Sequence, residues 1–401
     1  MPRRTDNKGR ALKAGESQRK DLLYQYRYTD NLGKRQTVYA STLQELRQKE
    51  AEIDEYAKSG VNYASGNITV VELLERYLAL QQGRRYNTQV GYAFVLNLVK
   101  KEPFGQRIIR NIKASDAKLW FIKLSREGRS FSTICSIRGV LKPAFQMAFE
   151  EDIIRKNPFV FKMDIIPNDT KKREAMTPQQ QIDFMTFIRD DEHYCECYDE
   201  YVVLLETGVR ISEFVGLTKN DLDFEKRRIH VDHQLVKRRT GEYYIEKTKT
   251  ESGDRYIPMT DRCYESLRNI LFNRPKPKVE MIVNGYTGFL FLDKKGKPKV
   301  ALHFEHQMKR AVEKYNNTHD EPLPKITPHV FRHTFCTNMA RAGMDVKSLQ
   351  YLMGHSDVTI TLNVYTHMSY EHAAESMAKI IDLQNEVLQM CPCQAELPQK
   401  A

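Results

Sequence analysis

Histidines, arginines and a tyrosine gather near the C-terminal end of the sequence. The stretch HVFRHTF places His329, Arg332 and His333 within five positions, and the later stretch LNVYTH contains Tyr365. Imidazole and guanidinium groups donate charge-assisted hydrogen bonds to anions, and a phenol becomes a nucleophile once it is deprotonated. Together these residue types favour a site that binds a phosphate and attacks it.

The spacing of His329 and Arg332 indicates how they could converge. They are three positions apart and directly follow Pro328. If Pro328 lies in the first turn of a helix, both side chains lie on one face, which suits two donors to one phosphate. A metal site from His329 and His333 is the alternative. A valine follows His329, so an H-E-x-x-H base is missing, and the nearby arginine would repel a cation.

Two further candidates, Arg210 and His355, also have ordinary structural explanations. Arg210 follows a Thr-Gly interruption in LLETGVRISEFVGL, within one turn of Glu206 and Glu213. That spacing suits a structural salt bridge as well as a catalytic arginine. His355 lies in LQYLMGHSD, at a turn where Gly354 ends an apolar helix.

The lysine and tyrosine candidates are ambiguous by themselves. Lys249 lies in EKTKTESGDRYIP, in a Thr/Ser/Gly-rich turn between two strand-like runs, and Lys247 competes with it. Tyr365 follows the β-branched run at 358–361, and a tyrosine in such a context is usually a core residue.

Charge separates the front of the chain from the rest. Residues 1–165 carry 30 Lys and Arg against 18 Asp and Glu, whereas residues 166–401 carry 33 against 34. The net charge of +11 therefore comes from the first part. A basic face without a partner is one reading. A polyanion bound by the front of the chain is the favoured one.

The first segment, 1–66, is predicted to be a small three-stranded sheet followed by a helix. LLYQYRYTD alternates tyrosines with polar residues, and a turn with Gly33 leads into KRQTVYA, which predicts a hairpin. Its exposed face would carry Arg27, Lys34 and Arg35. A helix then begins after Ser41 or Thr42. Such a sheet could enter a DNA major groove, or it could be an ordinary sheet with solvated charges.

The second segment, 67–165, has the apolar spacing of a helical domain. Four helical stretches begin near 69, 87, 114 and 130, and Trp120 in the third is expected in the core. Basic residues lie near the helix ends, where they could bind phosphates or simply complement the helix dipole. The candidate DNA contacts here are Arg84, Arg85, Lys100 and Lys101.

The third segment, 174–401, reads as mainly helical with a small antiparallel sheet formed by runs between 227 and 260. The fold class expected for the whole chain is therefore a multidomain α+β protein. A last helix, SYEHAAESMAKIIDLQNEVLQ, carries an apolar stripe. It could pack within its own subunit or lie in a groove on another copy.

Composition excludes several classes of protein. With 41% hydrophobic residues and no apolar run near 18, the chain is expected to be soluble and not to span a membrane. The N-terminus has no apolar h-region, so it is not a secretory signal. Seven scattered cysteines favour reduced thiols in the cytosol, and the two C-x-C pairs lack the second pair that a zinc site needs.

The order of the motifs carries more information than any single one. T-G-x-R-I-S-E, K-T in a strand turn, H-x-x-R-H-T-F, L-M-G-H-S and T-x-x-x-Y-x-H resemble the tyrosine recombinases, the phage-type integrases. The resemblance covers nearly the whole chain. The N-terminal stretch NKGRALKAGESQRKD with its hairpin resembles the arm-binding domain of integrases from conjugative transposons.

The resemblance implies a role for each candidate. The catalytic set would be Arg210, Lys249, His329, Arg332, His355 and the nucleophile Tyr365. The arginines and histidines would stabilise the phosphorane transition state, and Lys249 would protonate the leaving 5′ oxygen. The reaction would form a 3′-phosphotyrosyl link and a Holliday junction without metal or ATP.

The resemblance also implies domains and partners. Residues 1–66 would bind arm sites, 67–165 would form a helical, SAM-like core-binding domain, and 174–401 would form the catalytic domain. Four copies would assemble on double-stranded DNA attachment sites with exchange of the C-terminal helix, in the bacterial cytoplasm at the nucleoid. An excisionase and a host DNA-bending protein are expected partners. The alternatives are a type IB topoisomerase and a non-catalytic DNA-binding protein.

Overall fold

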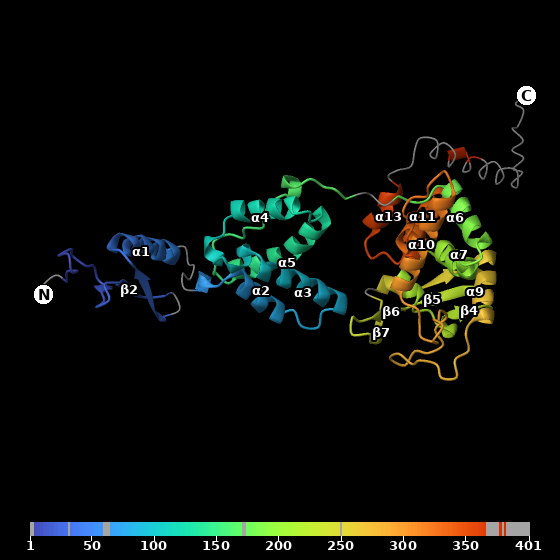
Figure 1. Cartoon of the computed structure of the whole chain (residues 1–401), viewed down its shortest axis with the longest axis horizontal. Helices are drawn as coiled ribbons and strands as arrows, with labels where there is room; N and C mark the ends of the chain where they lie inside the picture. The colour runs from blue at the N-terminus through green and yellow to red at the C-terminus, as the bar shows by residue number, and fades with distance from the viewer. Residues whose placement is uncertain are drawn as a thin grey trace, which may run out of the picture. The chain divides into compact units, whose positions relative to one another are not determined.

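The computed structural model describes residues 4–30, 33–58, 65–170, 174–248, 251–365, 377–378 and 381. The chain divides into two compact units, residues 1–171 and 172–401 (Figure 1). The predicted boundary at 66 and 67 lies inside the first unit, so the division into three domains stays a prediction.

The first unit begins with the predicted three-stranded sheet. Strands β1 (Glu16–Gln18), β2 (Tyr24–Thr29) and β3 (Arg35–Ala40) form an antiparallel sheet in the order β1-β2-β3. Helix α1 (Leu43–Lys58) follows, and the Thr42 hydroxyl accepts from the Glu45 N–H at its start. Tyr24, Ala40 and Leu46 are buried in one apolar cluster. Tyr24 thus lies on the packed strand face that the alternation predicts.

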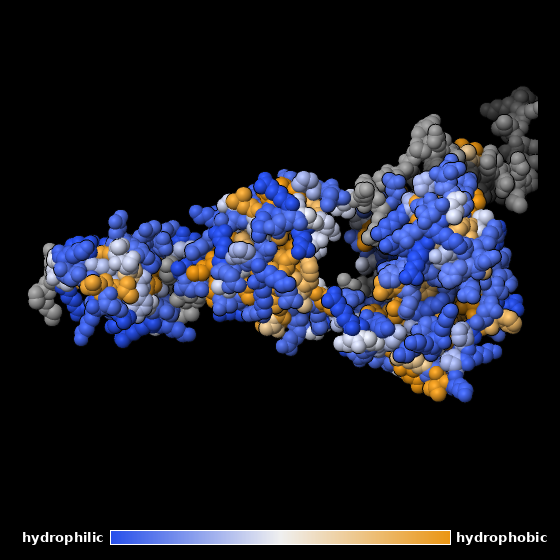
Figure 2. All heavy atoms as spheres, in the orientation of Figure 1, coloured by the Kyte–Doolittle hydropathy of each residue, from blue (hydrophilic) through white to orange (hydrophobic). Residues whose placement is uncertain are grey.

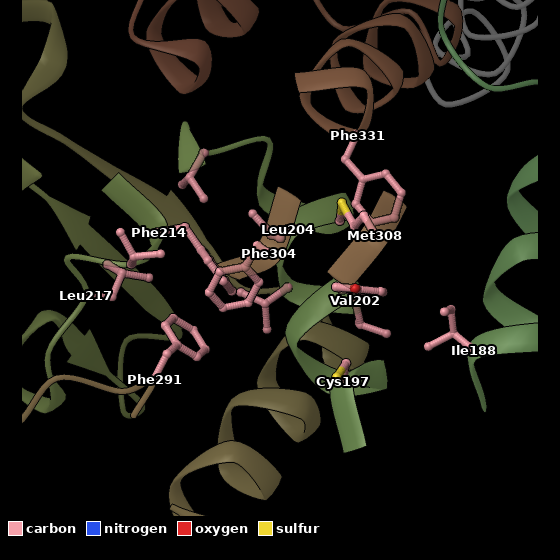
Figure 3. Packing of buried hydrophobic residues seen from close by; sticks show 14 of the residues in the cluster. Ile188, Cys197, Val202, Leu204, Phe214, Leu217, Phe291, Phe304, Met308 and Phe331 are labelled. Carbon is pink, nitrogen blue, oxygen red and sulfur yellow. The ribbon is translucent and has the colours of Figure 1, made fainter. Parts of the chain in front are cut away.

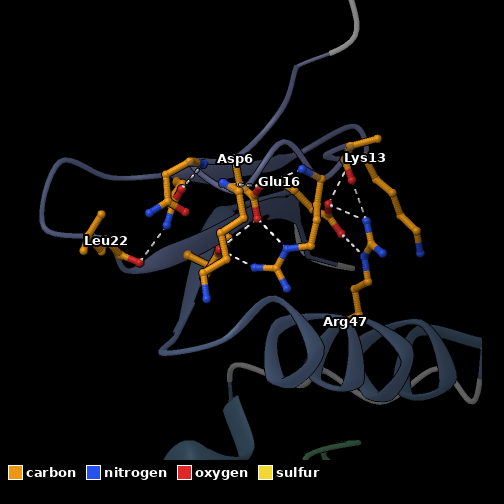
Figure 4. A network of polar contacts seen from close by, with 11 residues as sticks. Asp6, Lys13, Glu16, Leu22 and Arg47 are labelled. Atoms are coloured by element: carbon orange, nitrogen blue, oxygen red, sulfur yellow. Dashed lines mark hydrogen bonds and ion pairs between the residues drawn. The ribbon is translucent and has the colours of Figure 1, made fainter.

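Polar contacts fix α1 to the sheet (Figure 4). Arg47 donates from Nε to Oε1 of Glu16 at 3.0 Å and from Nη2 to the Ala11 carbonyl at 2.8 Å. Asp6 accepts from the Tyr24 hydroxyl at 2.9 Å. Both carboxylates are buried but paired, which avoids the cost of an unsatisfied buried charge.

The helical part of this unit has its own core. Helices α2 (Val70–Ala79), α3 (Tyr86–Lys101), α4 (Ala114–Arg126) and α5 (Phe131–Glu150) correspond to the four predicted stretches. Trp120 is buried as expected and stacks on Phe104 with ring centroids 4.4 Å apart. This hydrophobic cluster shares no buried residue with the one beneath the N-terminal sheet.

The second unit is mainly helical, as predicted. Its helices are α6 (Pro178–Asp190), α7 (Tyr198–Thr207), α8 (Ile211–Phe214), α9 (Asp261–Asn273), α10 (Ala301–Thr318), α11 (Pro328–Arg341), α12 (Val346–Met353) and α13 (Val358–Tyr365). Its strands are β4 (Leu222–Asp223), β5 (Arg228–Val231), β6 (His233–Lys237), β7 (Tyr243–Lys247) and β8 (Arg255–Pro258). The predicted strands divide into two antiparallel sheets, β4-β5-β8 and β6-β7.

Aromatic packing holds the short helix α8 in place. Phe214 stacks on Phe291 with centroids 4.1 Å apart and meets the edge of Phe304 at 5.3 Å (Figure 3). The turn before α8 depends on Gly208, which has a φ of +60° and lies directly against the Phe335 ring. A side chain at position 208 would collide with that ring, so this turn requires glycine.

The visible face of each unit is mainly hydrophilic, with scattered apolar patches (Figure 2). Among the described helices, none combines the length and the apolar character that crossing a bilayer requires. The predicted C-terminal helix lies outside the described residues except for 377–378 and 381.

Candidate active site

Arg210 caps the N-terminus of helix α8, and both terminal nitrogens of its guanidinium are hydrogen-bonded. Nη1 donates to Oε1 of Glu213 at 2.7 Å, and Nη2 donates to the Gly354 carbonyl at 2.8 Å. The predicted salt bridge to Glu213 is therefore present, but it orients Arg210 without burying it. The side chain remains 40% exposed, so its guanidinium is accessible to a ligand.

Arg332 lies on α11 and is almost completely buried. Nη1 donates to the Gly208 carbonyl at 2.7 Å and Nη2 donates to the Met353 carbonyl. Burial, followed by the positive charge of Arg210, lowers the pKa of Arg332 to about 9. A cation held in so unfavourable a position is strongly stabilised by an incoming anion.

A third arginine, Arg255 at the start of β8, joins the same group. It donates from Nε to the Leu352 carbonyl at 2.8 Å and from Nη2 to Oε2 of Glu213 at 2.8 Å. From the sequence, Glu213 is expected only as a salt-bridge partner, and Arg255 is not among the candidate residues. A signal was present, because alternation along β8 places Arg255 on the same buried face as Ile257.

The C-terminal end of α12 connects the three arginines. Its last carbonyls, those of Leu352, Met353 and Gly354, have no partner within the helix and lie at the negative end of its dipole. Each accepts a hydrogen bond from a different guanidinium, Arg255, Arg332 and Arg210 respectively. We call these three groups the α12 carbonyls. They bring together arginines from α8, β8 and α11.

His355 follows directly after this turn. Gly354 has a φ of +60°, which ends α12 as the sequence predicts, and Nδ1 of His355 lies 3.0 Å from the Thr361 hydroxyl. Burial, then the positive charges of Arg332 and Arg210, lower the pKa of His355 to about 4. At neutral pH the imidazole is therefore neutral in the free protein.

We expect the pKa of His355 to change when an anion binds at the site. The folded pKa lies below the unfolded value of about 6.5, so the folded state loses stability as pH falls from about 6.5 to 4. Selective ¹³C-histidine NMR should show His355 protonating near pH 4, with the signal assigned by its loss in His355→Gln. A DNA duplex that brings a phosphate into the site should raise that pKa. An unchanged pKa with bound DNA would contradict a phosphate at this position.

Tyr365 ends α13 and packs on a small apolar cluster with Phe335, Leu349 and Met353. Its hydroxyl donates to the Met344 carbonyl at 2.6 Å, and burial raises the pKa of the phenol. From the sequence, Tyr365 is expected to be a core residue, and its ring is partly buried against this cluster. In this conformation the hydroxyl is bonded to a carbonyl, so it must leave that bond before it can attack anything.

Two family models match the chain. The phage integrase family matches residues 174–372, and the DNA binding domain of Tn916 integrase matches residues 1–56. The transposase from transposon Tn916 of Enterococcus faecalis is 41% identical over 392 residues, covering 94% of this chain and 96% of that protein. The chain belongs to the phage integrase family of tyrosine recombinases. The transposase from Tn1545 of Streptococcus pneumoniae is equally similar, at 41%.

Solved structures of related integrases agree with this membership. The Tn1549 transposon integrase in complex with a circular intermediate DNA has a TM-score of 0.75 and 41% identity, covering 78% of this chain and 99% of that one. A λ integrase dimer bound to a core site, at 17% identity and a TM-score of 0.54, shares the fold. The predicted family, fold class and site-specific recombinase activity are therefore confirmed.

Of the two remaining catalytic candidates of this tyrosine recombinase, the structure describes His329 but not Lys249. Pro328 is in the first turn of α11, as predicted, and His329 lies exposed in that turn, three positions before Arg332. Lys249 lies outside the described residues. Lys247, its competitor, ends β7 and is exposed. The roles of all six candidates stay predictions.

The predicted DNA contacts are at the surface. Arg27, Lys34 and Arg35 are exposed at the β2–β3 hairpin, as predicted from the alternation. The other four lie at opposite ends of α3, with Arg84 and Arg85 before its start and Lys100 and Lys101 in its last turn. Lys100 forms an ion pair of 2.7 Å with Glu75.

Within the described part of the chain, one group has the spacing of metal ligands, Asp221, Asp232 and His233. The two ring nitrogens of His233 face oxygen acceptors, Nδ1 facing Asp232 and Nε2 facing the Gly216 carbonyl at 2.8 Å. Asp221 accepts from the backbone and hydroxyl of Thr218. These bonds explain the cluster as a structural one. His329 and His333, the metal pair considered from the sequence, do not belong to this group.

Proposed function

We propose that this recombinase cuts and rejoins DNA at the attachment sites of a mobile element through a covalent bond to Tyr365. The observation that carries the proposal is the surplus of positive charge around the α12 carbonyls. Arg210 and Arg255 both pair with one carboxylate, Glu213, and Arg332 donates to two backbone carbonyls. The pKa of Arg332 is lowered to about 9 and that of His355 to about 4. A phosphodiester would supply the missing negative charge.

The chemical step follows from the residue types. The phenolate oxygen of Tyr365 forms a bond to phosphorus, and the bond from phosphorus to the 5′ oxygen breaks. Arg210, Arg332, His329 and His355 would donate to the non-bridging oxygens, and these bonds strengthen as charge develops in the transition state. The 5′ oxygen leaves with a proton, for which Lys249 is the candidate donor. A 5′ hydroxyl from a second duplex reverses the step.

The phenol must first leave the Met344 carbonyl. We infer that DNA binding moves α13, because the hydroxyl cannot both donate to that carbonyl and approach a phosphate at Arg210 and Arg332. Once there, the surrounding positive charge would lower the pKa of the phenol, which burial raises in the free protein.

The guanidiniums and the lysine would supply the charge that Mg²⁺ provides in other phosphoryl-transfer enzymes, so the reaction would need neither metal nor ATP. The deciding experiment is covalent trapping on a duplex nicked beside the cleavage point. An adduct that survives SDS and forms in EDTA supports the proposal. A protein that relaxes plasmids lacking attachment sites would instead act as a type IB topoisomerase.

The proposed assembly extends this chemistry. Four copies would hold two double-stranded DNA sites, exchange C-terminal helices and pass through a Holliday junction in the bacterial cytoplasm. The Tn1549 structures with circular intermediate and transposon right end DNA support a DNA partner. An excisionase and a host DNA-bending protein would set the direction of the reaction.

The N-terminal segment would bind arm sites independently of cleavage. Its core is separate from that of the helical part, although Arg155 forms a 2.6 Å ion pair with Glu55 and lies over the Tyr56 ring. Deleting residues 1–66 should remove arm-site binding and leave cleavage of a core-site duplex within about 3-fold of wild type. Gel-shift and trapping assays measure the two effects.

Replacing Arg27, Lys34 and Arg35 together by alanine provides the milder control. These exposed side chains can be removed without disturbing the buried core. The triple variant should reproduce the loss of arm-site binding. If the deletion also abolished core-site cleavage, the proposed domain boundary would be wrong.

A further inference from the structure

Arg255 is a buried arginine that does not belong to the predicted catalytic set. It nevertheless contacts residues that lie next to members of that set. Its side chain is fully buried. It donates from Nε to the Leu352 carbonyl at 2.8 Å, from Nη1 to the Gly253 carbonyl at 3.0 Å and from Nη2 to Glu213 at 2.8 Å. Burying a guanidinium is costly unless such partners compensate for the lost water.

Each acceptor belongs to a different part of the site. Glu213 holds Arg210 through its other oxygen. Leu352 lies in the last turn of α12, three positions before His355. Gly253 ends the short helical turn Glu251–Gly253, which lies between β7 and β8 in the chain. One planar side chain therefore links the carboxylate that holds Arg210, the end of the helix before His355 and the Glu251–Gly253 turn.

The turn at Gly354 packs directly on this guanidinium. A Cβ atom added at Gly354 would lie 2.9 Å from Nη1 of Arg255 and 3.0 Å from the Ser252 carbonyl. The absence of a side chain at Gly354 thus serves two purposes, the positive φ and the close approach to Arg255. The approach also places the Gly354 carbonyl where Arg210 can reach it.

The geometry of the guanidinium is essential to this arrangement. Its donors form a rigid fork that reaches three acceptors in different directions, whereas a lysine ammonium is a single point on a flexible stem. A lysine at 255 could keep the charge beside Glu213 but could not also hold both carbonyls. Arg210 and the His355 turn would then be free to shift relative to each other.

We propose that Arg255 is a positioning residue for the recombinase reaction, which sets the relative placement of Arg210 and His355 without touching DNA. This inference rests on the proposed cleavage chemistry. Because Arg255 would act on geometry and not on ground-state binding, its loss should slow cleavage while DNA affinity is retained. A misplacement of this kind costs about 10- to 100-fold in rate.

Arg274 offers a matched control in the same unit. It is also buried, and it donates to the Phe289 carbonyl at 2.7 Å and to both oxygens of Glu280 at 2.9 and 3.0 Å. Arg274→Lys therefore removes a comparable set of buried bonds away from the α12 carbonyls. It measures what structural damage alone does to cleavage.

The experiment compares Arg255→Lys, Arg274→Lys and wild type on one nicked core-site duplex. Expected for Arg255→Lys is a single-turnover rate of adduct formation lower by about 10-fold or more, with Kd within about 2-fold. Arg274→Lys should show a similar drop in thermal midpoint but cleave within about 2-fold of wild type. Equal rates for Arg255→Lys and wild type, or equal losses in both variants, would overturn the inference.

A second variant covers the case in which Arg255→Lys does not fold. Gly354→Ala introduces a methyl group against Nη1 of Arg255, and it should likewise lower the rate with little change in Kd. If Gly354→Ala cleaved DNA at the wild-type rate, the proposed positioning role of Arg255 would be rejected. The proposed function is tested separately, because its failure would appear as the absence of any adduct with wild type.

Discussion

Tyr365→Phe is expected to abolish the covalent protein–DNA adduct on a nicked suicide duplex, while DNA binding by gel shift is retained. Phenylalanine keeps the ring that packs on Phe335 and Leu349 but removes the hydroxyl oxygen that is proposed to bond phosphorus. The fold should lose about 1 kcal/mol, since the hydroxyl also donates to the Met344 carbonyl. A defect confined to chemistry is what covalent catalysis predicts.

Tyr351→Phe is the matched control. Tyr351 lies one helix earlier on α12, is 48% exposed, and its hydroxyl accepts from the Tyr256 N–H at 3.0 Å. Tyr351→Phe also loses a hydroxyl and one hydrogen bond to the backbone, but outside the proposed chemistry, so it should form adduct at nearly the wild-type rate. An adduct that persists in Tyr365→Phe would show that another residue is the nucleophile. Loss in both variants would indicate damage to the fold.

The sequence predicted the parts of the site whose signals are local. Pro328 predicted the start of α11, Gly354 predicted the end of α12, and alternation predicted the β2–β3 hairpin. These features depend on the φ angles and side-chain periods of a few neighbouring residues. The catalytic positions came from motif order, which carries family information that no single residue holds.

The features that could not be predicted from the sequence depend on packing between residues far apart in the chain. Alternation places Arg255 on the buried face of β8, but its partners Glu213 and Leu352 are 42 and 97 positions away. Alternation likewise defines strand faces and not strand partners, so the split into two sheets was not visible. Helix α13 contains β-branched residues throughout its first turn and still forms, because packing against α11 and α12 outweighs propensity.

The second large effect is expected for Arg210→Lys, which should bind a core-site duplex nearly as well as wild type but cleave it about 100-fold more slowly. The guanidinium holds Glu213 and the Gly354 carbonyl with two of its nitrogens and still exposes N–H groups to a ligand. A lysine ammonium reaches one partner at a time and cannot present a fork to a phosphate. Its charge is retained, so the long-range attraction for DNA remains.

Arg262→Lys separates this effect from general loss of an arginine. Arg262 is 48% exposed, lies 3.5 Å from Glu206 and donates to the Tyr198 hydroxyl at 3.0 Å, so it resembles Arg210 in exposure and partners. It should cleave within about 2-fold of wild type, as a surface substitution does. If DNA affinity of Arg210→Lys fell in parallel with its single-turnover rate, Arg210 would act in binding the ground state. A fall in rate alone places its contribution in the transition state, where the surplus charge around the α12 carbonyls has its effect.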